Sequence, residues 1–140
     1  MTMWLGAAVI LGVIASLVIM TMRTGSRERT SRLSGREDFG SDVIYSQFFE
    51  KNHLPRELAL ELWNEVARSL RVPPGKLRPT DRFDKELAPV EEWDDDIVEV
   101  QWAAERRLKR NKTKADLSQI KTVGDYVEFF CNLARQRQQT

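Results

Sequence analysis

The chain has only one cysteine, Cys131, and one histidine, His53, among its 140 residues. A single cysteine excludes an intramolecular disulfide, and a lone histidine argues against a zinc site, which needs several histidine or cysteine ligands. The sequence also lacks a glycine-rich phosphate loop, a Ser-His-Asp arrangement and a catalytic pair of acids. We therefore expect a protein that is not an enzyme and that has neither a metal site nor a bound cofactor.

Runs of alternating apolar and polar residues are also missing, so nothing in the sequence indicates a β-strand. From Asp42 onward the acidic and basic residues nearly balance. A basic run between residues 106 and 114 contains no aromatic residue, and we interpret it as a solvated helix end. With no basic excess and no recognised motif, the chain is not expected to bind nucleic acid.

The longest apolar run covers residues 3–22, which contain no charged side chain. A helix of this length rises about 30 Å, the thickness of a bilayer core, so the run predicts a transmembrane anchor over residues 1–22. Arginines follow the run and none precedes it. The positive-inside rule then predicts a single-pass membrane protein with its N-terminus outside, its C-terminal domain in the cytoplasm and the lipid bilayer as a partner.

Residues 23–41 are rich in glycine, serine, threonine and arginine and contain few apolar side chains. This composition is typical of a flexible linker, so we expect a basic and polar tether between the anchor and a folded domain. The domain itself is expected to cover residues 42–140, which is enough for one modest hydrophobic core.

Helical spacing of apolar residues predicts that this domain is all-α. Asp42 is expected to cap a short helix over residues 43–52, and Pro55 to open a helix that ends near Leu70. A long loop follows, and two more helices are expected over about 94–110 and from the capping residue Thr122 to about residue 130. The expected inward residues include Ile44, Leu58, Leu62, Val66, Leu70, Ile97, Val100, Ala104, Leu108, Val123, Tyr126, Val127 and Phe130. Trp63 and Trp102 are assigned to core or interface packing.

Several short motifs between Pro55 and Phe130 have a family pattern. They are Phe83 with Leu87, Trp93-Asp94-Asp95, Val98-Glu99 and Ile120-Lys121-Thr122-Val123. Together they resemble the acyl carrier protein family, which implies a small helical bundle with a long loop between its first two main helices. The resemblance places Asp94 where the family has the serine that carries phosphopantetheine. A carboxylate cannot form that phosphodiester, because the chemistry needs a hydroxyl nucleophile.

Acidic residues gather where the third of these helices begins. In carrier proteins this helix presents acids to basic patches on partner enzymes, so the resemblance implies a protein-docking surface. The candidate partner-binding residues are Trp93, Asp94, Asp95, Asp96 and Glu99. A purely structural role remains open, because carboxylates at a helix N-terminus complement the helix dipole. A metal site is disfavoured, because consecutive aspartates point in different directions around a helix.

The sequence therefore predicts a membrane-anchored carrier-like domain without phosphopantetheine, which binds or scaffolds proteins of fatty-acid, polyketide or lipid synthesis. One alternative is a genuine carrier with an unusual attachment residue, for which Ser69, Thr80, Ser118 and Cys131 are the candidates. A second alternative is a structural membrane protein that binds anionic lipid.

Overall fold

The computed structural model describes residues 12–16, 27–89 and 95–139. Its long elements are α2 (Ser41–Phe48), α3 (Arg56–Leu70), α4 (Asp96–Arg110) and α5 (Val123–Gln138). Residues 12–16 and 27–32 are also helical, and short 3₁₀ turns lie at Glu50–Asn52 and Pro74–Lys76. The described residues contain no strand beyond one isolated bridge between Arg82 and Thr122. The prediction of an all-helical bundle is confirmed for this part of the chain.

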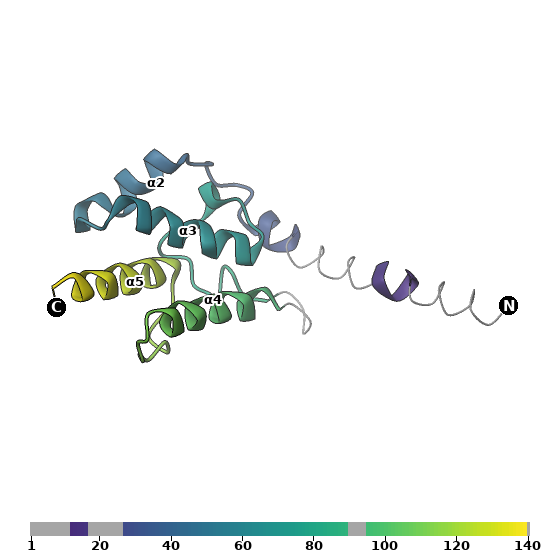
Figure 1. Cartoon of the computed structure of the whole chain (residues 1–140). Helices are drawn as coiled ribbons and strands as arrows, with labels where there is room; N and C mark the ends of the chain where they lie inside the picture. The colour runs from purple at the N-terminus through teal and green to yellow at the C-terminus, as the bar shows by residue number, and fades with distance from the viewer. Residues whose placement is uncertain (1–11, 17–26, 90–94, 140) are drawn as a thin grey trace, which may run out of the picture.

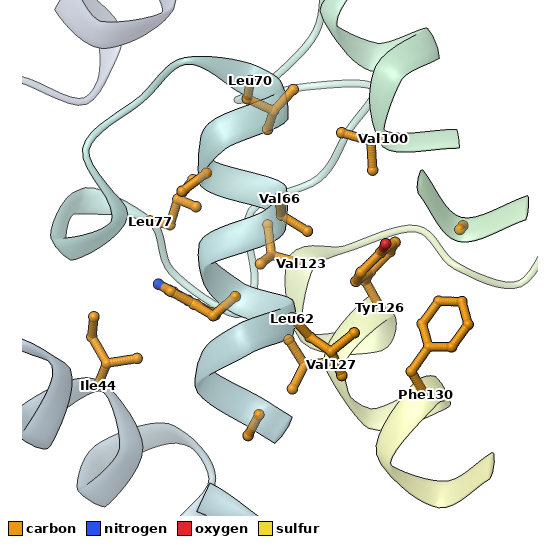
Figure 2. Packing of buried hydrophobic residues seen from close by; sticks show 14 of the residues in the cluster. Ile44, Leu62, Val66, Leu70, Leu77, Val100, Val123, Tyr126, Val127 and Phe130 are labelled. Carbon is orange, nitrogen blue, oxygen red and sulfur yellow. The ribbon is translucent and has the colours of Figure 1, made fainter. Parts of the chain in front are cut away.

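Helix α3 forms the centre of the bundle, with α2 on one side and α4 and α5 on the other (Figure 1). Its residues Leu62, Trp63, Val66 and Leu70 have no exposed surface. Figure 2 shows Leu62 and Val66 beside Val123, Tyr126 and Val127 of α5. The spacing of three or four residues that predicted the helix therefore also supplies its buried stripe.

Local sequence signals set the ends of these helices. Helix α3 follows Pro55 and stops at Arg71, which adopts a left-handed conformation with φ 55°. Helix α5 begins with a capping box, in which the Thr122 hydroxyl accepts from the Asp125 amide and the Asp125 carboxylate accepts from the Thr122 amide. The positions of Pro55 and Thr122 therefore define where the two helices begin, as the sequence predicted.

The long loop after α3 is attached to the start of α5. The Val123 amide donates to the Asp81 carbonyl at 3.1 Å, and the Gly124 amide donates to the Pro79 carbonyl at 2.9 Å. A Cβ atom on Gly124 would lie 3.0 Å from Pro79, so a larger residue here would push the loop outward by a few tenths of an ångström. The loop is consequently held against the bundle rather than free in solvent.

The predicted membrane anchor requires a correction. No helix within the described ranges has both the length and the apolar character needed to cross a bilayer. Of the predicted span, only residues 12–16 are described, and they form a short helical segment; residues 3–11 and 17–22 lie outside the described residues. A span needs about 20 residues. The prediction of a single-pass membrane protein with a cytoplasmic domain is therefore wrong for the part of the chain that the structure describes.

Part of the segment predicted as a flexible tether is packed against the folded domain. Residues 23–26 lie outside the described residues, but residues 27–41 pack on the bundle, with Leu33 and Arg29 fully buried. Arg36 donates two hydrogen bonds to buried Asp81, at 2.6 and 2.8 Å. Arg29, Arg32 and Arg36 are therefore anchors, because each donates to acceptors on residues at least 40 positions later in the chain.

Candidate functional site

The five predicted partner-binding residues do not form one exposed cluster. Trp93 and Asp94 lie outside the described residues. Asp95 is the residue before α4 and is exposed, and Glu99 is exposed one turn later. Asp96 has a different environment, which removes it from the candidate surface.

Asp96 is directed into the protein by two arginines. Arg29 Nη1 lies 3.0 Å from one carboxylate oxygen, and Arg71 Nε lies 3.7 Å from the other. The Asp96 side chain is only 13% exposed. Since a buried guanidinium needs a charge partner, Asp96 stabilises the attachment of residues 27–36 to the bundle. The prediction that it docks a partner is therefore corrected in favour of an internal role.

Trp102 is the one aromatic residue of α4, and half of its surface is accessible. It lies between the acidic start and the basic end of the helix, and half-buried Val98 precedes it by one turn. We define the α4 face as the outward residues Asp95, Val98, Glu99, Trp102, Glu105, Arg106 and Lys109. The sequence analysis grouped Trp102 with core or interface residues. Its position two residues after inward Val100 turns it by about 200°, which could have identified it as outward.

The charges on the α4 face are not used inside the protein. Within the described part of the chain, Asp95, Glu99, Arg106 and Lys109 have no ion-pair partner. Arg107 behaves differently, because it points toward α3. The basic run that the sequence analysis treated as one solvated helix end therefore divides into outward and inward residues.

Arg107 belongs to a polar network between three helices. Its Nε donates to Glu65 at 2.9 Å, and its Nη2 donates to Glu61 at 2.8 Å. The Tyr126 hydroxyl of α5 donates to the other Glu65 oxygen at 2.8 Å. Burial lowers the pKa of Arg107, but the hydrogen bonds to Glu65 and Glu61 outweigh it and raise this pKa above the usual value. Burial, reinforced by Glu65, raises the pKa of Tyr126 well above its usual value. This network fixes α4 against α3 and α5.

A groove of about 610 Å³ lies between α4 and the connector that precedes α5. Its walls are mainly apolar, and its polar residues include Gln101, Glu105, Asp116 and Ser118. The apolar lining comes from Phe83, Ile97, Val100, Ala104, Leu108, Leu117, Ile120 and Tyr126. The volume falls in the range of small-molecule sites, which is about 300–1,000 Å³. No charged group in this lining is basic.

The reactive residue types do not form a catalytic arrangement in the described ranges. Cys131 is fully buried, and burial raises the pKa of its thiol to about 11. His53 is exposed between α2 and α3, at φ 53°. No group of three or more metal-ligating side chains occurs among the residues with described positions. These positions offer neither an activated nucleophile nor a metal centre.

Comparisons with protein-family models, with curated proteins and with solved structures found no match to this chain. The resemblance to acyl carrier proteins therefore stays a prediction from the sequence.

Proposed function

We propose that this chain is a non-enzymatic protein-binding domain and that the α4 face is its contact surface. The observation that carries this proposal is Trp102, which is half exposed at the middle of a well-packed helix. Aromatic residues surrounded by polar groups are the commonest anchors of protein interfaces. Asp95 and Glu99 give the same face an acidic end that complements a basic patch on a partner.

The size of the exposed tryptophan supports an energetic role. A tryptophan buries up to about 250 Å² when it is covered, so the exposed half of Trp102 corresponds to about 100 Å². At about 25 cal/mol per Å², covering it contributes about 2–3 kcal/mol to association. This contribution is comparable to that of a hot-spot residue in a known interface.

The rigidity of α4 supports the same role. Val100 and Ala104 are buried on its inner side, and Arg107 ties the helix to Glu61 and Glu65 of α3. A surface that is already ordered loses less conformational entropy when a partner binds. The α4 face is therefore pre-organised for recognition.

The surroundings of Cys131 and the residues at the start of α4 argue against the alternative of a covalent carrier. The thiol of Cys131 is buried and has a raised pKa, so it is a poor attachment site. Asp95 and Asp96, at the start of α4, have no hydroxyl group. We expect the intact mass of the protein from its native cell to match the unmodified polypeptide. A mass increase matching phosphopantetheine would refute this part of the proposal, and Ser118 at the groove would be the first residue to examine.

A photo-crosslinking experiment tests the proposed contact surface. Trp102 is replaced by benzoylphenylalanine in the native cell, and the matched control carries the same residue at Val43, which is exposed on α2. We expect a crosslinked product from position 102 that position 43 does not give. Glu99→Lys reverses a charge on the α4 face and should reduce the yield of the crosslinked product from position 102. Glu57→Lys, on an exposed part of α3, should leave that yield unchanged. Equal products from both positions would refute the assignment of the α4 face.

The groove favours a second function, the binding of an apolar small molecule. Its volume and apolar walls are the supporting observations. Titration with decanoate, followed by NMR, should shift signals of residues that line the groove, and Leu117→Asp should abolish the shifts. Uniform or absent shifts would refute this second function.

A further inference from the structure

The α4 face carries acidic residues before Trp102 and basic residues after it. Glu99 and Asp95 precede Trp102 by three and seven residues, and Arg106 and Lys109 follow it by four and seven. All four charged side chains are exposed. Helical geometry places Glu99 and Arg106, which are two turns apart, on the same side of the helix. Apart from Glu105, an exposed acid three residues after Trp102, the face is therefore acidic at one end, apolar in the middle and basic at the other end.

Two other charged residues of α4 are used inside the protein. Asp96 is paired with Arg29, and Arg107 is paired with Glu61 and Glu65. What remains outward on one flank of Trp102 is Glu99 on one side and Arg106 on the other, at similar distances from it. Glu105 is also exposed, but it lies about 120° around the helix from Glu99, on the opposite flank. Such a surface is complementary to its own copy turned end for end.

We propose that two copies of this chain associate through their α4 faces, antiparallel to each other and related by a two-fold axis beside Trp102. This inference rests on the proposed function of the α4 face and names its partner. A two-fold axis perpendicular to α4 reverses the helix direction and keeps each flank opposite itself. Glu99 then faces Arg106 of the second copy, and Asp95 faces its Lys109.

The charges on the α4 face favour the antiparallel over the parallel arrangement of the two helices. Each contact occurs twice in a two-fold dimer, so each proposed ion pair has a symmetric equivalent. In a parallel arrangement the acidic ends would meet each other, and the basic ends would do the same, which is repulsive. At the centre, the two Trp102 rings would cover each other.

The size of the surface sets the expected strength of this dimer. Figure 1 shows α4 at the edge of the bundle, so one helix face makes the contact. A standard interface buries about 800 Å² on each partner, and a single helix face offers less. We therefore expect a weak dimer, with a Kd between about 10 μM and 1 mM.

Single charge-reversal variants, and a double variant that restores the charge pattern, test the proposed dimer. The Kd of the full chain is measured by sedimentation equilibrium at about 5 μM to 2 mM, a range that includes the expected Kd. Glu99→Arg alone and Arg106→Glu alone should each raise Kd at least about tenfold, because like charges then meet. The double variant Glu99→Arg/Arg106→Glu restores complementarity and should return Kd to within about threefold of the original. Glu57→Arg, on an exposed part of α3, should leave Kd unchanged.

Two outcomes overturn the proposal, and they differ in what they say about the α4 face. A chain that stays monomeric, or a Kd that no reversal changes, refutes the antiparallel dimer. If position 102 then still crosslinks to a different protein in the cell, the proposed function stands and only its partner is wrong. If position 102 gives no specific crosslink either, both proposals fail.

Discussion

Replacing Arg29 with alanine tests the most consequential contact of the N-terminal segment. Arg29 has no exposed surface, and its guanidinium donates to the carbonyls of Leu87 and Leu70 and to Asp96. These acceptors come from the loop, from α3 and from α4. One side chain therefore connects residues 27–36 to three separate parts of the bundle.

The expected cost of Arg29→Ala is large. Removing one partner of a buried ion pair costs about 3–5 kcal/mol, because the remaining charge and acceptors lose their partner. A domain of this size has a total stability of about 5–15 kcal/mol. At about 4–8 °C per kcal/mol, the melting temperature should fall by at least about 12 °C.

Urea denaturation followed by circular dichroism at 222 nm measures this change, with Arg32→Ala as the matched control. Arg32 is exposed, and within the described ranges it donates one hydrogen bond, to the Ala88 carbonyl, besides a 3.7 Å pairing with Glu28. The control should cost less than about 1 kcal/mol. If Arg29→Ala also costs less than about 1 kcal/mol, the segment is not docked as described and the reasoning is refuted.

Three further predictions concern the core. Tyr126→Phe removes a hydrogen-bond donor from a half-buried carboxylate and should cost about 1–3 kcal/mol in urea denaturation; no change would show that the network adds nothing to stability. Burial holds the pKa of Cys131 at about 11, so its thiol stays protonated longer in the folded state, and stability should fall as pH rises from about 9 to about 11. Cys131→Ala should flatten this part of the pH profile, and an unchanged profile would contradict the assignment. Gly124→Ala crowds Pro79 and should cost about 1–3 kcal/mol, whereas Gly35→Ala in open space should cost much less; equal effects would refute the close approach.

The sequence was sufficient to predict features that depend on near neighbours in the chain. Pro55 and Thr122 mark helix starts by local chemistry, and the buried stripe of α3 follows from residue spacing. The helix expected over about 94–110 is observed as Asp96–Arg110. Such signals act within one or two turns, so no knowledge of the tertiary structure is needed to interpret them.

Features that depend on distant partners were missed. Arg29 and Arg36 looked like solvated linker residues, because composition does not indicate which carbonyls or carboxylates will meet a guanidinium. Asp96 and Arg107 looked like members of exposed charge clusters for the same reason. Arginine is especially difficult to place from sequence, since its long side chain and five donors suit both solvent and buried acceptors.

The docking of residues 27–41 determines the smallest fragment that should fold. A fragment that starts at Ser41 would keep all four long helices and nearly the whole apolar core. It would nevertheless lose Arg29 and Arg36, and would leave the carboxylates of Asp96 and Asp81 in positions shielded from water without these partners. The part of the chain that folds as one unit therefore begins at or before residue 27. Its start is determined by the arginines that neutralise the two shielded carboxylates, and not by where the first long helix begins.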